Sequence, residues 1–306
     1  MENHTAKHFV LQLGSLVSLY LSISFLLVLL FGVITLSFPD PAEGYYIAES
    51  AASSVRLGIA MVIVFFPTYL ILTRIVNKIR RSEGTTAYLG LTKWLIYLSL
   101  LIGGIVLLGD LVAVIMAFLE GELTQRFLLK AFAVLLVVGA AFHYYLLDAK
   151  GYWLTREDKS IFYAIGMSLV VIVSIIYGFT SIDTPTSVRE QKLDQAQLFD
   201  LQDIQYQIED YIVRTNTLPE KLSDLEKTGI GLSSAPEGRE AYSYEKTEQG
   251  FRLCATFAKA SEPGDFSSPM FVDETALIKN NSNWTHGAGR YCFERVVNLE
   301  RPALPK

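Results

Sequence analysis

The sequence predicts a polytopic α-helical membrane protein with five transmembrane helices and a C-terminal α+β soluble head. The chain of 306 residues is 51% hydrophobic and 19% charged, with a mean hydropathy of +0.33, which is more apolar than is usual for a soluble enzyme of this length. The apolar residues gather in five long runs before residue 182. Beyond it, 14 Lys and Arg stand against 20 Asp and Glu, a net charge of −6, whereas the first part carries 12 against 11. We therefore expect a transmembrane domain over 1–182 and a head over 183–306.

The five runs are matched to the thickness of a bilayer. A hydrocarbon core about 30 Å thick requires about 20 helical residues. The predicted spans cover about 9–37, 57–76, 91–119, 127–147 and 160–182. The first run has about twice the apolar length of a signal-peptide core, so we expect it to be retained as a span.

Basic residues predict how the spans are oriented. If the N-terminus is cytoplasmic, nine Lys and Arg fall on the inner side and three on the outer side, which agrees with the positive-inside rule. The inner residues are Lys7, Arg74, Lys78, Arg80, Arg81, Lys93, Lys150, Arg156 and Lys159, and the outer ones are Arg56, Arg126 and Lys130. Trp94 and Trp153 fall at the same inner interface, as expected for an aromatic belt. Five spans then place the head outside the cytoplasm.

The head begins with the pattern of an amphipathic helix. Its apolar residues recur at three- and four-residue steps: Leu193, Leu198, Leu201, Ile204, Ile208, Tyr211 and Ile212. Thr217 and Pro219 predict the end of this helix, followed by a short second helix. Two strand-like runs around Gln249 and Gly250 predict a hairpin, and "RYCFERVVNL" predicts a last strand.

Both cysteines of the chain, Cys254 and Cys292, fall in these predicted strands. A pair confined to the extracytoplasmic part indicates a disulfide formed in an oxidising compartment. Such a bond would close a loop of about 38 residues and stabilise the head by about 3–4 kcal/mol. Two buried free thiols are the alternative. A metal site would need more ligands than these cysteines and His286 supply.

The order of a long helix, an "LP-x-x-L-x-x-L" segment and a small antiparallel sheet resembles the globular heads of type II secretion pseudopilins and type IV pilins. The resemblance covers about residues 187–257. It rests on the hairpin and on Ile204, Ile208, Tyr211, Asn216, Leu218, Pro219, Leu222 and Leu225. A pilin leader-peptidase site does not precede the head, because the preceding helix is the fifth span. The resemblance therefore implies a fold and not pilus assembly.

The transmembrane part resembles a family of uncharacterised bacterial membrane domains, catalogued as a domain of unknown function. The resemblance rests on "PTYLILTRIVNKIRR" followed by two further spans and "AAFHYYLLDAK", and it covers about residues 10–180. It implies a location in the cytoplasmic membrane of a bacterium and no particular activity.

Two charged residues within the spans are candidates for function, since charges in a membrane are costly. Asp110 lies about ten residues, or about 15 Å, from the outer end of the third span, and Lys130 lies one turn inside the fourth. The spans are antiparallel neighbours, so the two side chains could form an intramembrane polar pair. The pair could serve a proton or ion site, or it could be structural.

His143, in the inner third of the fourth span, is the other candidate. Since no second histidine lies at a suitable depth, an interfacial hydrogen-bonding role is favoured over a proton relay or a cofactor ligand. His286, beside a glycine-rich loop, is interpreted in the same way as structural.

These observations favour a non-enzymatic protein. The sequence contains no Walker loop, no Gly-x-Ser-x-Gly elbow and no zinc motif, so we expect no catalytic residues, cofactor or metal. The acidic head excludes nucleic-acid binding. Besides the lipid bilayer, the expected partner is an envelope protein or a cell-surface polymer that the head contacts. The alternative function is a small transporter or channel subunit that uses Asp110 and Lys130.

Overall fold

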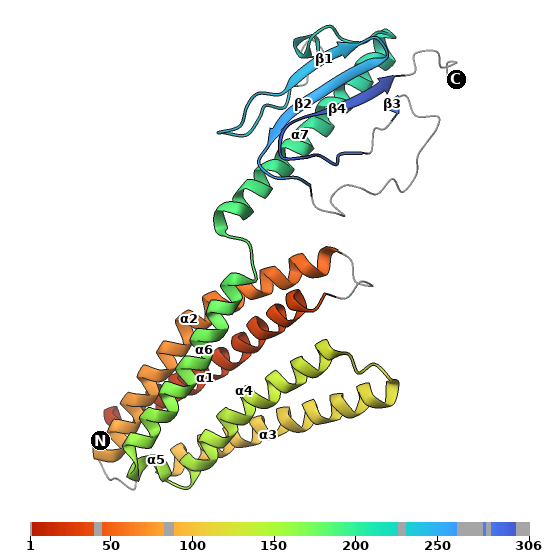
Figure 1. The fold of residues 1–306 in the computed structure, drawn as a ribbon. Helices are drawn as coiled ribbons and strands as arrows, with labels where there is room; N and C mark the ends of the chain where they lie inside the picture. Colours follow the sequence, from red (N-terminus) through yellow and green to blue (C-terminus); the bar gives the residue numbers. More distant parts are fainter. Residues whose placement is uncertain are drawn as a thin grey trace. The chain divides into compact units, whose positions relative to one another are not determined.

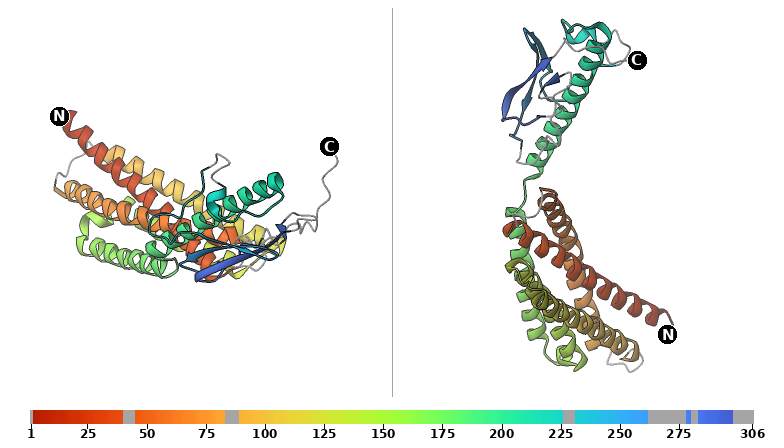
Figure 2. Two further views of the ribbon diagram at one scale, coloured as in Figure 1. Left: turned by 90° about the horizontal axis from the view of Figure 1, so that it is seen from above. Right: turned by 90° about the vertical axis from the view of Figure 1, so that its right-hand side faces the viewer.

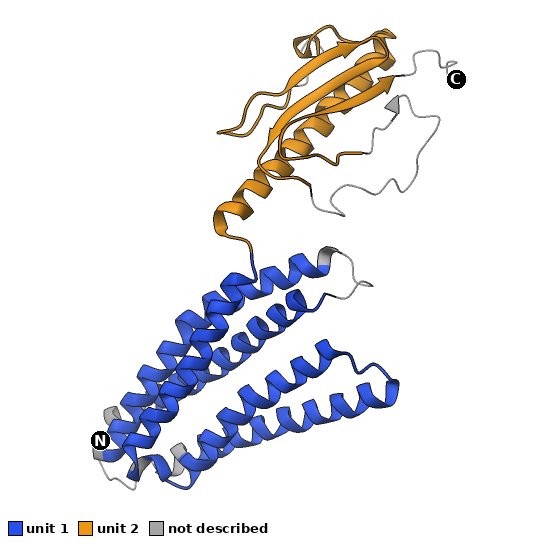
Figure 3. Cartoon of the chain, in the orientation of Figure 1, with its two compact units in different colours: residues 1–182 blue, residues 183–306 orange. Residues whose placement is uncertain are grey.

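The computed structural model describes residues 2–39, 45–82, 89–225, 231–261, 278–279 and 283–297. The chain divides into two compact units (Figure 3), unit 1 over residues 1–182 and unit 2, the head, over residues 183–306.

Unit 1 is helical (Figure 1). Its helices are α1 (Glu2–Ser37), α2 (Tyr45–Ser82), α3 (Leu89–Glu120), α4 (Gln125–Ala149), the short α5 (Tyr152–Thr155) and α6 (Glu157–Thr180). Within the described residues, the five long helices are each long and apolar enough to cross a membrane. The predicted fold class is therefore confirmed for this part of the chain.

Helix α2 is much longer than its apolar run. The run over 57–76 lies in the middle of a helix of 38 residues that continues through Pro67. The added turns contain charged residues, Glu49 and Arg56 at one end and Arg80 and Arg81 at the other. Hydropathy marks only the part of a helix that suits hydrocarbon, whereas backbone hydrogen bonds continue wherever the residues tolerate a helix.

Helices α1 and α2 form the centre of unit 1. Their shared core also receives one side chain each from α4 and α6, and it consists of Leu26, Leu29, Val33, Val55, Ile59, Val62, Val137 and Val171. The two helices approach closely at Gly58, where a Cβ atom would lie 2.8 Å from Cβ of Leu29. A small residue at such a crossing lets the two backbones pack without a side chain between them.

The head begins with helix α7 (Pro185–Thr215). The Thr184 hydroxyl caps it by accepting a hydrogen bond from the Ser187 amide at 3.3 Å, and Pro185 occupies the first turn, where a missing N–H costs nothing. Asn216 ends it with a left-handed φ of 55°, just before the predicted stop. The predicted second helix is one turn of 3₁₀ helix, Leu222–Asp224.

The sheet of the head has four strands in the order β1-β2-β4-β3, with antiparallel neighbours. The strands are β1 (Ser243–Thr247), β2 (Gly250–Phe257), β3 (Ile278–Lys279) and β4 (Gly289–Val297). The predicted hairpin is confirmed, although its turn consists of Glu248 and Gln249, and Gly250 is already paired with Val296 of β4. A Cβ atom on Gly250 would lie 1.9 Å from the carbonyl oxygen of Arg295, so the glycine serves strand pairing.

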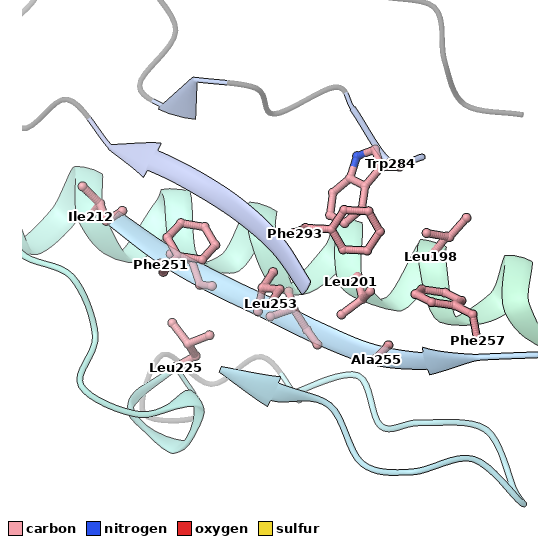
Figure 4. Packing of buried hydrophobic residues seen from close by; sticks show 12 residues of the cluster. Leu198, Leu201, Ile212, Leu225, Phe251, Leu253, Ala255, Phe257, Trp284 and Phe293 are labelled. Carbon is pink, nitrogen blue, oxygen red and sulfur yellow. The ribbon is translucent and has the colours of Figure 1, made fainter. Parts of the chain in front are cut away.

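Helix α7 covers one face of this sheet, as the views in Figure 2 show. Between them lies the core of the head (Figure 4), with Leu198, Leu201, Ile204, Ile208 and Ile212 from α7, Phe251, Leu253, Ala255 and Phe257 from β2, and Leu225, Trp284 and Phe293. The predicted α+β architecture of the head is thus confirmed, and the buried apolar face of α7 packs against the sheet.

Candidate functional site: a cavity with a basic end in unit 1

One end of unit 1 holds a buried polar cluster, made of Asn77 and Arg80 on α2 and Tyr144 and Asp148 on α4. One guanidinium nitrogen of Arg80 donates to both carboxylate oxygens of Asp148, at 3.0 and 3.1 Å. The Asn77 amide donates to the Tyr144 hydroxyl at 3.4 Å. Residues three or four apart share one face of a helix, so each helix presents both of its polar side chains to the other. Because a buried carboxylate without a partner would be costly, this cluster binds α2 to α4.

Aromatic residues extend the same end of the unit. The Trp153 indole N–H donates to the Tyr144 carbonyl at 3.0 Å, and the two rings stack with centroids 5.0 Å apart. Arg81 donates to the Trp153 carbonyl and forms an ion pair with Glu157, both at 2.8 Å. The Tyr163 hydroxyl donates to the carbonyl of Ala140 at 2.6 Å. These contacts join α2, α4, α5 and α6 beside the polar cluster.

A cavity of about 760 Å³, the bundle cavity, opens beside this cluster and is lined by residues of α1, α2, α4 and α6. Towards one end of the cavity the walls are apolar and include Leu26, Val62, Phe66, Val137 and Val171. Its volume lies within the range of about 300–1,000 Å³ that small-molecule sites occupy.

The other end of the bundle cavity is basic. Arg74, Lys78 and Arg81 line it from one face of α2, because their spacing is four and then three residues. Arg74 and Lys78 are exposed and have no hydrogen-bond or ion-pair partner in the part of the chain that the structure describes. Glu157 lines the cavity as well, but it is already paired with Arg81. This end therefore carries uncompensated positive charge.

The candidates Asp110 and Lys130 lie on α3 and α4. The Lys130 ammonium lies 5.8 Å from the centroid of the Phe31 ring of α1. Among the described residues no ion pair joins it to Asp110, which is partly exposed on α3. The pairing stays a prediction, and the lining found for the bundle cavity includes neither residue.

The two histidines have different surroundings. His143 is exposed on α4, with its ring 6.3 Å from that of Tyr163. In the head, His286 is buried and stacks on Phe257 with ring centroids 3.7 Å apart, and its Nδ1 lies 3.1 Å from the carbonyl oxygen of Gly287. These contacts are those of a packed side chain, which agrees with the structural interpretation of His286.

Cys254 and Cys292 form a disulfide in the structure. They lie opposite each other on β2 and β4, and neither side chain belongs to the core beneath α7. The bond therefore crosslinks the sheet on the face turned away from the helix. In the described ranges, no group of three or more His, Cys, Asp and Glu is placed to hold a metal ion.

A buried arginine of the inner strand β4, Arg295, contacts α7 beside the core of the head. The Arg295 side chain donates to the Gln205 amide oxygen at 2.6 Å and to the Asn283 carbonyl at 2.9 Å, and its guanidinium lies 4.4 Å from the ring centroid of Trp284. Burial lowers the pKa of Arg295 to about 10. Because this pKa still lies well above physiological pH, the side chain carries its positive charge there.

The head also exposes an apolar line on α7. Phe199, Tyr206 and Val213 follow one another at steps of seven residues, and their exposed fractions are 59%, 68% and 75%. Seven residues are close to two helical turns, so the three side chains form one stripe, here called the α7 stripe, on the helix face turned away from the sheet.

Neither the bundle cavity nor the pair of Arg80 and Asp148 was predicted from the sequence. Arg80 was predicted only as one of the inner charges, and Asp148 lies one residue beyond the predicted fourth span over 127–147. A signal for this cluster was present in the sequence, because Asn77 and Arg80, like Tyr144 and Asp148, lie about one turn apart near the end of an apolar helix. Such spacing indicates a shared polar face.

Residues 8–145 match DUF5671, a family described as a domain of unknown function. The match covers α1 to α3 and most of α4, which is less than half of the chain. It agrees with the predicted resemblance to an uncharacterised domain over these residues. No curated protein and no solved structure matches the chain. The pilin-like character of the head stays a prediction.

Proposed function

We propose that this chain is a non-enzymatic integral membrane protein of the cytoplasmic membrane, whose five apolar helices anchor an extracytoplasmic head that binds an envelope protein. Five helices of sufficient length and apolarity support the anchor. A second compact unit with its own core and disulfide supports a head that functions as a separate module.

The observation that carries the proposal is the α7 stripe. Phe199 and Val213 are fourteen residues apart, with Tyr206 midway between them, and the stripe therefore extends over about 21 Å of helix. Isolated exposed apolar residues are common on protein surfaces, but an aligned series on one helix face is typical of an interface. Steps of seven residues match the seam by which one helix packs against another. A protein partner that presents an apolar helix face therefore fits this surface.

Photocrosslinking tests the stripe. A benzoylphenylalanine at Tyr206 should give a discrete, protease-sensitive adduct in intact cells, whereas the same group at Glu248, exposed in the hairpin turn, should give none. Replacing Phe199, Tyr206 and Val213 by Gln should abolish an adduct formed from Gln202, since glutamine keeps helix propensity and removes the apolar surface. Equal adducts at both positions would contradict the proposal, and a protease-resistant adduct would indicate a cell-surface polymer instead.

The orientation belongs to the same proposal and rests on the nine inner and three outer basic residues. A membrane-impermeant thiol reagent tests it on Cys254 and Cys292, which are disulfide-bonded. In intact cells we expect labelling only after reduction. Protection until the cells are lysed would place the head in the cytoplasm and reverse the orientation.

The transport alternative has weaker support, because Lys130 lies against Phe31. It predicts that Asp110→Asn abolishes activity while assembly in the membrane stays intact. It also predicts that removal of residues 190–306 leaves the activity unharmed. The anchor proposal predicts the opposite result for the truncation.

A further inference from the structure

We propose that the bundle cavity is a binding site for an anionic amphiphile, a lipid whose phosphate headgroup lies at the basic end and whose hydrocarbon chain extends along the apolar walls. The site belongs to unit 1 alone, so it is independent of the partner proposed for the head.

The positive charge at the basic end favours an anionic ligand. Arg74 and Lys78 line the cavity one helical turn apart, and neither has a partner in the described part of the chain. Arg81 extends the row by a further turn, and its Nε is buried without a hydrogen-bond partner among the residues that the structure describes. Two free cations and an unsatisfied guanidinium N–H suit a phosphate group, which offers several acceptor oxygens and a charge of opposite sign.

Neutral donors lie beside these charges. Asn77, Tyr144 and Ser160 line the same cavity. Their amide and hydroxyl groups could bond to phosphate or ester oxygens that the cations leave free. The basic end thus provides charge and directional hydrogen bonds together.

The rest of the cavity favours a hydrocarbon chain as its ligand. Lys78 and Val62 both line it and lie sixteen residues apart on α2, about 24 Å along the helix. Over the distal part the lining side chains include Leu26, Phe66 and Val171. A polar solute there would leave its own hydrogen-bonding groups unsatisfied, whereas an acyl chain has none to satisfy. Free phosphate would use only the basic end.

The depth also fits a lipid. A hydrocarbon core is about 30 Å thick, so one leaflet contributes about 15 Å. A headgroup held at the end of α2 that carries Lys78 and Arg81 would place its chain beside the apolar walls at the depth that lipid tails occupy. Basic residues at this level attract anionic lipids in particular.

Native mass spectrometry of the full chain in detergent tests the site. The probes are phosphatidylglycerol and phosphatidylcholine with identical chains, and glycerol 3-phosphate as the tail-less anion. For the unchanged chain we expect phosphatidylglycerol to bind more tightly than phosphatidylcholine. In the double variant Arg74→Gln, Lys78→Gln its affinity should fall about thirtyfold.

The matched control replaces two other basic residues. Lys93 and Lys150 are exposed and are not among the lining residues, so Lys93→Gln with Lys150→Gln should retain the preference for phosphatidylglycerol. An equal loss in this control would overturn the proposal, because general surface charge would then account for the binding.

A second variant tests the tail. Ala164 lines the cavity from α6, and Ala164→Phe should fill the chain-binding part while the basic end stays intact. We expect phosphatidylglycerol to bind at least tenfold more weakly to this variant. Unchanged binding would overturn the proposal. Displacement of phosphatidylglycerol by an equal concentration of glycerol 3-phosphate would also overturn it, since the site would then recognise a free anion.

Discussion

The two units use the same apolar residue types in opposite ways. In unit 1, Leu108 of α3 is 65% exposed and Phe162 of α6 is 79% exposed. In the head, Leu201 and Ile204 are fully buried between α7 and the sheet. Many apolar side chains of unit 1 therefore face outward, as expected for helices surrounded by an apolar solvent. In the head, the buried apolar side chains pack between α7 and the sheet.

Each unit has exceptions, and they mark the candidate sites. In unit 1 the exceptions are buried polar groups, foremost Asn77 and Asp148 beside the bundle cavity. In the head they are the exposed apolar residues of the α7 stripe. The helices of unit 1 also differ, since 39% of the most apolar part of α1 is buried within the unit and only 6% of that of α3. Helix α1 is thus mainly a packing element within unit 1, whereas the apolar surface of α3 is largely exposed.

The largest effect should come from matched leucine truncations. Leu201→Ala in the head should lower its free energy of unfolding by about 4 kcal/mol, because the side chain is fully buried and would leave a cavity. Leu108→Ala on α3 should cost unit 1 less than about 1 kcal/mol, since its side chain is largely exposed. Hydrogen exchange of backbone amides measures both units separately. Equal costs would break the distinction between the units.

Loss of the disulfide should have the next largest effect. The bond joins residues 38 positions apart, so the double variant Cys254→Ala, Cys292→Ala should destabilise the head by about 3–4 kcal/mol through the entropy of the open chain. The bond lies outside the cluster beneath α7, so its removal leaves the packing of that cluster in place. Denaturant unfolding with and without reductant measures it, and reductant should leave the double variant unchanged. A loss of stability in unit 1 would contradict the independence of the two units.

Removal of Asp194 should have the third largest effect on stability, because its carboxylate is a buried charge inside the head. Its carboxylate accepts hydrogen bonds from Arg239 at 2.7 Å and from the amides of Ala258 and Lys259 at 3.0 and 2.9 Å. Asp194→Ala leaves these donors without their acceptor and should cost about 2–3 kcal/mol. The control is Asp210→Ala, which removes an ion pair with the largely exposed Arg214 and should cost about 0.5 kcal/mol. Similar losses in both variants would contradict a structural role for Asp194.

Much of the fold could be predicted from the sequence, because its determinants are local. Five apolar runs predict five helices from length alone, and a three- and four-residue step predicts the buried face of α7. The ends were less accurate. The amphipathic pattern predicted from the sequence begins at Leu193, although Thr184 and Pro185 form an N-terminal cap and the helix begins at Pro185.

The candidate site could be predicted only in part, because it depends on how the helices are rotated about their axes. The disulfide was accessible because the chain has two cysteines, both in predicted strands. Arg80 and Asp148, in contrast, lie 68 residues apart, and no local pattern specifies that their helices meet on these faces. The same limit applies to Asp110 and Lys130, which were paired from depth alone.

The smallest effect concerns Glu209, a half-buried carboxylate on the otherwise well-packed helix α7. Burial raises its pKa, opposed by a hydrogen bond from Gln205 and by the charge of Arg295. The folded head therefore holds this proton more tightly than the unfolded chain does, and the resulting stabilisation at low pH is lost as the pH rises through the raised pKa. Glu209→Gln should remove this dependence and stabilise the head at pH 7 by about 0.5 kcal/mol or less. Denaturant unfolding at pH 4 and pH 7 measures the difference, with the exposed Glu248→Gln as control. A larger gain at pH 4 than at pH 7 would reverse the sign and show that Glu209 is stabilised as a carboxylate.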